Sequence, residues 1–457
     1  MGQLDGFRKI STDGLWNRVT RGRRFPILRD MNTTRRSFIG TTAASALALT
    51  TRLQAAEPGS IIKLGVIGTG WYGMVNAKTA LKIGGVEITA VCDVDSEHLE
   101  AAAVELEKLQ GKRPQTFKLY QEMLDQAGLD AVIIGTPTQW HALQLLAAIG
   151  KGLDVYCEKP VSYDIREGRA MVDAVKASDR IVQVGFQRRQ SKAYQKVREL
   201  VAAGEIGRVV QADAQIHYNA ENSDPAPVEP PASLDWDLWC GPAPKIPYSK
   251  QVGHKSWRLE KTTGNGHMVD WGLHNIDAAR MILGLSMPKR VTADGGIYHF
   301  KNTITTPDSL TVNFEYDELP VVWRHRLWGA LEFAPQRSNG IYLYGEKGSV
   351  FVEETKYTLL SKVGDKLEEQ EFKFEGRHGT EHMKDFLECV RTRRKPFCSI
   401  EDAFQSTTAV HLAMIAYETR SVVEWDGMKE EITGNPEAGK MLKREYRQPW
   451  VHPGKGA

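Results

Sequence analysis

The stretch Leu64-Gly-Val-Ile-Gly-Thr-Gly-Trp-Tyr-Gly73 joins an apolar run to three closely spaced glycines. The run that feeds it, Ile61 to Ile67, has the pattern of a buried strand. Apolar positions at helical spacing follow from Val75 to Leu81. A strand, a tight turn with this glycine spacing and a helix form the fingerprint of a dinucleotide-binding unit. The stretch therefore predicts an α/β fold that starts with a nucleotide site.

Each glycine of this turn has a separate task. Gly68 allows the sharp turn, Gly70 lets the backbone approach a pyrophosphate, and Gly73 lets helix and strand pack closely. The free N–H groups at the helix start then face the phosphates, and the helix dipole favours their charge. We expect cofactor contacts from the whole turn: Gly68, Thr69, Gly70, Trp71, Tyr72 and Gly73.

An acidic residue supports this prediction. The apolar run Val86 to Cys92 ends in Asp93, twenty residues beyond Gly73, where the fingerprint expects the carboxylate that binds the ribose. Such a carboxylate accepts from both ribose hydroxyls and repels a 2′-phosphate, so NAD is predicted rather than NADP. The alternative is a glycine-rich turn beside an ordinary aspartate. It is disfavoured because motif, strand and acidic residue occur together.

Strands and helices alternate from Ile61 to about Gly185, which predicts a doubly wound parallel sheet in a Rossmann domain spanning 57–185. The expected elements are a helix at 97–110 with Ser96 as N-cap, a strand at 130–135, a helix at 139–149, a strand at 153–157, a helix at 165–177 and a strand at 181–184. Ligands bind at the carboxyl ends of such strands. The residues expected there are Thr136, Pro137, Glu158, Lys159 and Gln187.

The pattern changes after Gly185. Residues 186–445 predict an α+β domain with a largely antiparallel open sheet that serves the substrate and oligomerisation, and 446–457 form a C-terminal tail. The expected elements are helices at 191–203, 268–283, 381–392 and 400–417, and strands at 209–218 and between 291 and 360. Residues 219–261, rich in Pro and Trp, are expected to be loop-like.

The first 56 residues are expected to lie outside the fold. Met31 opens a segment with the twin arginines Arg35 and Arg36, a short apolar stretch and small residues before the mature start, which is the pattern of a Tat export signal at 31–56. The apolar stretch is too short to span a membrane. A disordered basic tail is the alternative. Residues 1–30 are interpreted as an N-terminal extension, with Met31 as the true start.

Composition limits the possible partners. The whole chain has a net charge of +2, and leaving out the ten basic and three acidic residues of 1–56 changes it to −5. The basicity is thus a property of the export segment, and no nucleic-acid footprint remains. Five cysteines without a CxxC pair argue against a disulfide scaffold, and Cys92 and Cys157 are expected to be buried thiols.

Two stretches could carry chemistry. Lys159, in Glu-Lys-Pro at a strand end, could hydrogen-bond a substrate hydroxyl and stabilise alkoxide character, although most lysines at strand ends are merely solvated. Asp270 and His274 are four residues apart and would share a helix face. A histidine supported by a carboxylate is the usual general base near neutral pH.

Two other interpretations of the second stretch remain. His267, Asp270 and His274 could supply two imidazoles and a carboxylate to a metal, but the spacing is not that of a standard zinc helix and hydride transfer needs no metal. We therefore predict no metal. A polar helix face docked on a domain interface is the simplest alternative. Asp277 falls roughly on the same helix face as Asp270 and His274.

Taken together, these motifs resemble the glucose–fructose oxidoreductase and inositol dehydrogenase family, Gfo/Idh/MocA, over nearly all of the mature chain. The resemblance rests on the glycine turn, Cys92-Asp93, Thr136-Pro137 with His141, Glu158-Lys159-Pro160, and Asp270-x-Gly-x-His274. It implies that Lys159, Asp270 and His274 are catalytic and that His141 lies at the cofactor. The Trp-rich stretch 234–244 and the Tat signal resemble the exported branch. His267 departs from the family, where many members carry a small or apolar residue.

The sequence thus predicts an exported, periplasmic NAD-dependent oxidoreductase that acts on CH–OH groups of a sugar, cyclitol or glycoside. Trp257, Arg258 and His267 are weaker candidates for substrate contacts. The cofactor would be held tightly, because a periplasm lacks free NAD. The expected partners are a small carbohydrate, the Tat translocase during export and further copies of the chain, with no nucleic acid and no membrane after export. An NAD-using glycosidase or glycoside lyase, and a non-catalytic NAD-binding protein, are the alternatives.

Overall fold

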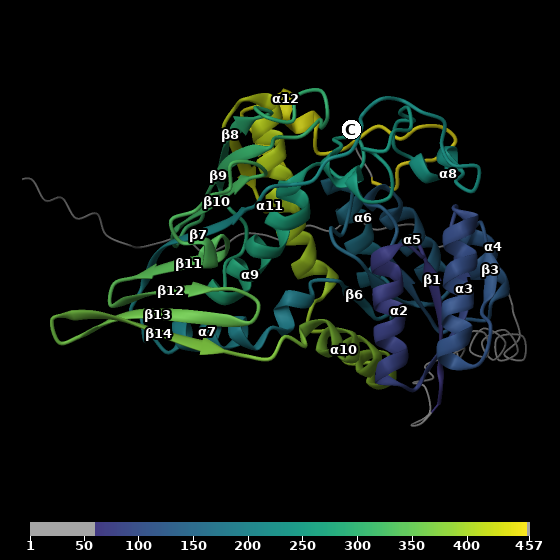
Figure 1. Ribbon diagram of the computed structural model, residues 1–457, viewed down its shortest axis with the longest axis horizontal. Helices are drawn as coiled ribbons and strands as arrows, with labels where there is room; N and C mark the ends of the chain where they lie inside the picture. The colour runs from purple at the N-terminus through teal and green to yellow at the C-terminus, as the bar shows by residue number, and fades with distance from the viewer. Residues whose placement is uncertain (1–59, 455–457) are drawn as a thin grey trace, which may run out of the picture. The chain divides into compact units, whose positions relative to one another are not determined.

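A computed structural model describes residues 60–454 of the 457-residue chain. The predicted extension at 1–30 and the Tat signal at 31–56 lie outside the described residues. Two sheets lie side by side, with the first sheet at the N-terminal, purple-to-blue end of the ribbon and most strands of the second in green (Figure 1). In the part of the chain that is described, no helix is long and apolar enough to cross a membrane.

The first sheet confirms the predicted Rossmann domain. Its order is β3-β2-β1-β4-β5-β6, and every neighbouring pair is parallel. The order runs outward in both directions from β1, as in a doubly wound sheet. Its strands are β1 Ile62–Ile67, β2 Val86–Cys92, β3 Gln115–Phe117, β4 Ala131–Ile134, β5 Asp154–Cys157 and β6 Val182–Val184. The central strands β4 and β5 are buried along their whole length, as parallel strands covered on both faces must be.

The helices of this domain follow the predicted periodicity. They are α2 Trp71–Ile83, α3 Ser96–Gln110, α4 Tyr120–Gln126, a 3₁₀ turn Thr138–Trp140, α5 His141–Gly150 and α6 Ile165–Lys176. One boundary was wrong: the N-cap of α3 is Asp95 rather than Ser96, because its carboxylate accepts from the backbone N–H of Glu97 and His98. The short β3 and α4 were not predicted.

The second sheet has ten strands in the order β14-β13-β12-β11-β7-β10-β9-β8-β15-β16. It is antiparallel except for the pair β7–β10. The strands are β7 Val209–His217, β8 Arg290–Gly296, β9 Ser309–Glu315, β10 Pro320–Arg326, β11 Asn339–Gly345, β12 Gly348–Val352, β13 Lys356–Val363, β14 Lys366–Lys373, β15 Val423–Asp426 and β16 Glu431–Thr433. This confirms the predicted open, largely antiparallel sheet.

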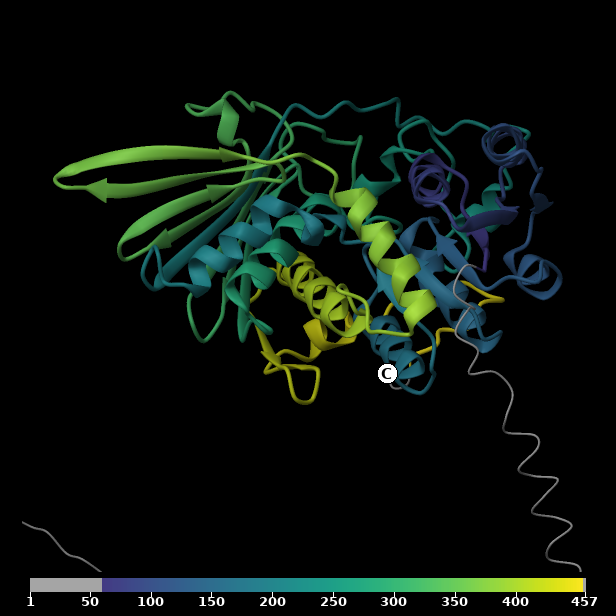
Figure 2. The same cartoon turned by 90° about the horizontal axis from the view of Figure 1, so that it is seen from below.

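Helices cover one face of this sheet (Figure 2). They are α7 Lys192–Ala202, α9 Leu273–Leu283 and α11 Ile400–Thr419. The other helices of this half are α8 Trp236–Cys240, α10 His378–Thr392 and α12 Pro436–Lys440. Short 3₁₀ turns lie at Gln187–Gln190, Ser256–Leu259 and Pro335–Arg337. The predicted helix at 268–283 is not uniform, because Met268–Gly272 form a π-helical turn before α9 begins. In β9 and β10 buried and more exposed residues alternate, as in a sheet covered on one face.

The two domains share a core. Helix α10 belongs to the second half of the chain, yet its apolar residues Met383, Phe386 and Leu387 pack with Ile62, Leu64 and other residues of the first sheet. Beside this core, Arg189 binds Asp277 of α9 and Asp402 of α11. The predicted buried thiols are confirmed, and all five cysteines are buried and unpaired.

Candidate active site

The glycine turn after β1 has the geometry that a pyrophosphate requires. Gly68 has a φ of +87°, a conformation that side chains disfavour. A Cβ on Gly70 would meet no atom within 4 Å, so space is open at this point of the turn. Helix α2 begins at Trp71 without a side-chain cap, which leaves backbone N–H groups for an anion. The turn therefore fits the NAD phosphates.

Asp93 lies at the end of β2, beside this turn. Its Oδ2 accepts from the backbone N–H of Thr69 at 2.7 Å and from the Thr69 hydroxyl at 3.0 Å. Its Oδ1 accepts from the backbone N–H of Asp95 at 3.0 Å. These bonds fix the carboxylate where the fingerprint expects the ribose, and they use only part of its acceptor capacity.

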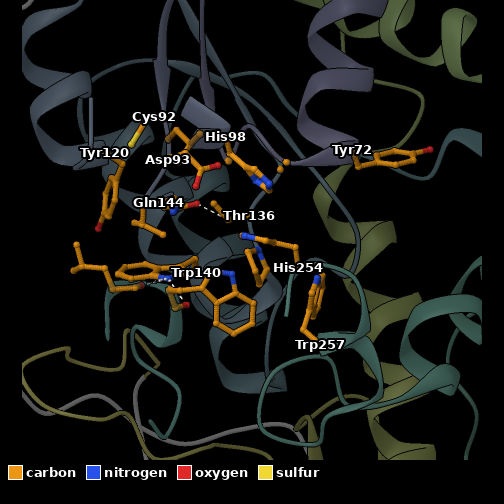
Figure 3. A pocket seen from close by; sticks show the side chains of 18 of the residues that line it. Tyr72, Cys92, Asp93, His98, Tyr120, Thr136, Trp140, Gln144, His254 and Trp257 are labelled. Atoms are coloured by element: carbon orange, nitrogen blue, oxygen red, sulfur yellow. Dashed lines mark hydrogen bonds between the residues drawn. The ribbon is translucent and has the colours of Figure 1, made fainter. Parts of the chain in front are cut away.

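A cavity of about 350 Å³ opens at the carboxyl edge of the first sheet (Figure 3). Its lining includes predicted residues from the glycine turn, from the ends of β2 and β4, and from the loop after β7: Gly68, Gly70, Trp71, Tyr72, Asp93, Thr136, Pro137, Trp257 and Arg258. Aromatic and basic side chains that were not predicted complete it: His98, Lys118, Tyr120, Trp140, Trp239, His254, Lys255 and Trp450. Its position and lining fit a nucleotide that lies along the turn.

Two segments from outside the Rossmann domain cover this cavity. The loop 219–261 is held by an isolated β-bridge between Leu234 and Asp95, and Trp140 donates from Nε1 to the carbonyl of Leu238 at 3.0 Å. Later in the same loop, His254 places Nε2 2.9 Å from Asp95 Oδ2. Trp450, near the C-terminus, packs edge-on against Trp140 with ring centroids 5.7 Å apart. The cover thus comes from parts of the chain far apart in sequence.

His141 does not line the cavity. Its side chain is buried, with Nδ1 2.8 Å from the carbonyl of Pro160 and Nε2 2.9 Å from that of Thr136. His141 therefore joins the loops that follow β4 and β5, and its predicted cofactor contact stays a prediction. Thr69 and Gly73 also lie outside the cavity lining, because Thr69 binds Asp93 and Gly73 packs against Gly68.

Glu158 and Gln187 also lie behind the cofactor cavity rather than in its lining. Glu158 Oε1 accepts from Asn76 Nδ2 and from Gln187 Nε2, both at 2.8 Å. Burial raises the pKa of Glu158 to about 7, although these hydrogen bonds and the charge of Lys159 oppose the shift. Glu158 therefore joins α2 to the strand end that carries Lys159, and the predicted cofactor contacts of Glu158 and Gln187 stay predictions.

Lys159 and Asp270 meet across the two domains. Lys159 Nζ lies 2.6 Å from Asp270 Oδ1 and donates to the Asp270 carbonyl at 3.0 Å. Arg258 Nε lies 3.5 Å from the same Oδ1. Burial opposes the charge on Asp270, but Lys159 and Arg258 outweigh it and hold its pKa well below the usual value. Asp270 is therefore a fixed anion that positions the Lys159 ammonium.

His274 lies one turn further, at the start of α9. The π-helical turn shifts it relative to Asp270, so the two residues do not keep the simple four-residue spacing of an α-helix. Burial and the charges of Lys159 and Arg188 lower the pKa of His274 well below its usual value. Its Nδ1 is buried and has no hydrogen-bond partner among residues 60–454. A neutral imidazole near the Lys159 ammonium can accept a proton.

His267 and Asp277 have different places. His267 is buried against Tyr218 and His325, with ring centroids 5.4 Å and 5.3 Å away, and its Nε2 has no partner in the described part of the chain. Asp277 does not join the site, because the Arg189 guanidinium binds its carboxylate in the interior. The helix face that was predicted from residue spacing therefore contributes to the site only as far as His274.

Three further residues near His274 were not predicted. Arg188 donates to Asn275 Oδ1 at 2.6 Å and lies 2.5 Å from Glu354 Oε1. Glu354 Oε2 lies 3.3 Å from His378 Nε2. Arg188 follows Gln187 at the end of β6, so the strand-end rule could have found it. Glu354 and His378 carry no local signal, because only the tertiary fold brings them there.

Comparison with known proteins agrees with this geometry. The profile "Oxidoreductase family, NAD-binding Rossmann fold" matches residues 62–186, and "Oxidoreductase family, C-terminal alpha/beta domain" matches residues 205–452, both of Gfo/Idh/MocA. The chain belongs to the Gfo/Idh/MocA oxidoreductase family. The predicted NAD-dependent oxidoreductase is thereby confirmed, and the family's NAD is the cofactor that the glycine turn and Asp93 fit.

Named relatives of this Gfo/Idh/MocA protein include two inositol dehydrogenases. Myo-inositol 2-dehydrogenase of Thermotoga maritima is 25% identical over 388 residues, which cover 82% of this chain and all of the relative. Scyllo-inositol 2-dehydrogenase (NAD(+)) of Bacillus subtilis is 26% identical over 355 residues, covering 75% of this chain and 90% of the relative. A levoglucosan dehydrogenase structure with NADH and levoglucosan aligns with a TM-score of 0.64 at 16% identity, covering 80% of this chain and 99% of that one. This last likeness shows the shared fold.

Proposed function

We propose that this protein oxidises a hydroxyl of a sugar, cyclitol or related glycoside, with NAD as a tightly held partner. The observation that carries the proposal is the Lys159–Asp270 pair beside the neutral His274. NAD, when bound along the glycine turn, accepts the hydride that the substrate carbon gives up. Lys159 holds the substrate oxygen as its negative charge grows, Asp270 positions Lys159, and His274 accepts the hydroxyl proton.

The names of the relatives support a polyol or sugar as substrate, since they are inositol dehydrogenases and a levoglucosan dehydrogenase. They do not favour the glycosidase or lyase alternative. Tight binding of NAD is supported by the aromatic cover over its cavity, to which the loop 219–261 and Trp450 both contribute.

The test has two steps on the purified protein. Denaturation should release NAD in close to one equivalent per chain, identified by mass. A panel of cyclitols, sugars and glycosides is then added to the native holoenzyme, and formation of reduced cofactor is followed by its absorbance. Reduction by at least one polyol is expected. Release of an aglycone with no lasting change in cofactor absorbance would instead favour the lyase.

The pH dependence of this reaction follows from His274. A base works only when it is neutral, and the pKa of His274 is lowered well below 6.5 by burial and by Lys159 and Arg188. Its acceptor form therefore persists as the pH falls through 6.5, and kcat/KM should stay level there before it declines at lower pH. Initial rates from pH 5 to 9 measure this. Because burial raises the pKa of Glu158 beside Lys159 to about 7, the profile is also measured on Glu158→Gln. An acid limb centred at 6.5 or above that persists in this variant would contradict the assignment of His274.

We also propose that the protein is exported to the periplasm through the Tat route. The twin arginines Arg35 and Arg36, with the short apolar stretch after them, support this. Replacing both arginines by lysine should keep the precursor in the cytoplasm. Fractionation and immunoblotting of cells that express either form measure the outcome. Recovery of the double variant in the periplasm at the wild-type level would contradict it.

The second sheet supports self-association. Helices cover one of its faces, and on the opposite face of β11 Tyr342 and Tyr344 stack with ring centroids 6.0 Å apart. We propose that this face joins copies of the chain. Light scattering of the purified protein should give an oligomer, and Tyr342→Glu with Tyr344→Glu should shift it to a smaller species. A wild-type monomer would refute the assembly.

A further inference from the structure

A histidine that the proposed reaction does not use lies next to its base. His378 is the first residue of α10, and Glu354 follows β12. Glu354 is held from three sides: its carbonyl accepts from the Ser191 hydroxyl at 2.7 Å, one carboxylate oxygen lies 2.5 Å from Arg188, and the other lies 3.3 Å from His378 Nε2. The carboxylate is therefore fixed before it orients the imidazole.

This arrangement leaves His378 with one free acceptor. A carboxylate beside Nε2 favours the proton on that nitrogen, so Nδ1 carries the lone pair. Burial lowers the pKa of His378, with Arg188 adding to the effect and Glu354 opposing it, and the ring is therefore neutral at neutral pH. Nδ1 is buried and has no hydrogen-bond partner within residues 60–454. Buried polar atoms nearly always find a partner, so this nitrogen calls for a donor from outside the chain.

A chain of contacts leads from His378 to the reacting centre. Glu354 binds Arg188, and the Arg188 guanidinium lies 5.1 Å from the ring centre of Trp271. Trp271 in turn packs edge-on against His274 with ring centroids 6.1 Å apart. His378 also lies close enough to His274 to affect the pKa of that ring. His378 thus lies near His274, and in each of the two rings the buried Nδ1 has no hydrogen-bond partner among residues 60–454.

Tyr72 lies between these residues and the cofactor cavity, because it lines the cavity and is also close to Glu354 and Arg188. It belongs to the glycine turn, and burial together with the charges of Glu158 and Glu354 raises the pKa of its hydroxyl. The phenol therefore stays protonated. The charged groups around His274 are accordingly paired, Lys159 with Asp270 and Arg188 with Glu354, while His378 and the Tyr72 hydroxyl are neutral. Such a lining suits uncharged hydroxyl groups better than an ionised substrate.

We propose that His378, oriented by Glu354, binds a second substrate hydroxyl next to the one whose proton His274 accepts. The site would then select substrates with two adjacent hydroxyls, as in cyclitols and sugars. This inference rests on the proposed function and adds a specificity-determining contact to it. A substrate that lacks the neighbouring hydroxyl leaves the His378 nitrogen buried and unpaired, which is the costly outcome for a polar site.

A double cycle of protein and substrate changes tests the contact. The substrates are the polyol that the wild-type holoenzyme oxidises fastest in the panel above, and its two monodeoxy analogues that lack one hydroxyl beside the reacting carbon. For the wild type, one of the two deletions should lower kcat/KM by about tenfold or more, the scale of a lost hydrogen bond with an unpaired partner. In His378→Ala the same deletion should have almost no further effect.

Two more variants test whether the loss of discrimination is specific to His378 and its partner Glu354. Glu354→Gln retains the shape of the side chain and should weaken the discrimination between the polyol and its deoxy analogue by a smaller factor. His299→Ala removes an exposed imidazole on the second domain and should behave as the wild type. NAD content should be unchanged in all three variants, because none of these residues lines the cofactor cavity.

The outcomes separate the two proposals. If the wild type oxidises no polyol, the proposed function fails, and this inference with it. If the wild type oxidises a polyol but His378→Ala loses the same factor on the polyol and on both deoxy analogues, the proposed function stands and His378 is only structural. If both His378→Ala and Glu354→Gln keep the wild-type discrimination, the contact with the second hydroxyl does not exist.

Discussion

Lys159→Ala and His274→Ala should each lower turnover by about a hundredfold or more while the purified proteins keep their NAD. The cofactor stays because the turn and the cavity that fit it do not include either side chain. The loss arises because Lys159 balances charge on the substrate oxygen and His274 takes the proton of the same hydroxyl. The two losses should be less than additive in the double variant, since groups that act as a unit are not additive.

The measurement is single-turnover reduction of the bound cofactor by a polyol, on variants with equal NAD content. Lys151→Ala is the matched control, because Lys151 is exposed and pairs with the exposed Asp125. His299→Ala serves the same purpose for His274. An alanine variant at 159 or 274 that reduces NAD at close to the wild-type rate would show that its residue is structural.

Asp270→Asn tests whether the negative charge of Asp270 is needed to position the Lys159 ammonium. The amide keeps the size of the side chain but removes the anion that holds the Lys159 ammonium at 2.6 Å. The Lys159 ammonium then lacks its fixed partner, and kcat should fall while NAD content remains. A variant with unchanged kcat would mean that the Asp270 carbonyl, 3.0 Å from Lys159 Nζ, is sufficient by itself.

Gly73→Ala is expected to have the largest effect on stability. A Cβ at this position would lie 1.9 Å from the carbonyl oxygen of Gly68, and the backbone of Gly73 also packs closely against Gly135. Both neighbours are backbone at the ends of central strands, so the clash can be relieved only by moving α2 away from the sheet. The free energy of unfolding should fall by about 3 kcal/mol or more, the upper range for overpacking, and NAD should be lost.

Gly70→Ala is the matched control in the same turn. A Cβ there would meet no protein atom within 4 Å, so the apoprotein should unfold at the wild-type temperature. The methyl group would instead occupy space that the pyrophosphate needs, and NAD content should fall. The unfolding temperatures must be compared between NAD-free proteins, because bound NAD itself raises the midpoint of thermal unfolding. A Gly73→Ala apoprotein as stable as the wild type would refute the packing argument.

The local pattern of the chain determined the Rossmann half and its cofactor. Strand, glycine turn, helix and Asp93 lie within one βαβ unit, where hydrophobic periodicity and backbone chemistry act over short distances. Strand ends could be predicted for the same reason, and Lys159 was found at one of them. The surroundings of His141 could not be predicted in this way, because a histidine whose ring nitrogens lie against backbone carbonyls has the same sequence context as one that contacts a ligand.

Tertiary structure alone decided the rest of the site. The π-helical turn at Met268–Gly272 sets the direction of His274, and its insertion depends on packing that no helical periodicity reveals. His254 and Trp450 cover the cofactor cavity from distant segments, while Glu354 and His378 meet Arg188 through contacts between separate elements. Such contacts form because burying the faces of the second sheet and of α10 brings remote residues together. A pattern read along the chain carries information only about neighbours.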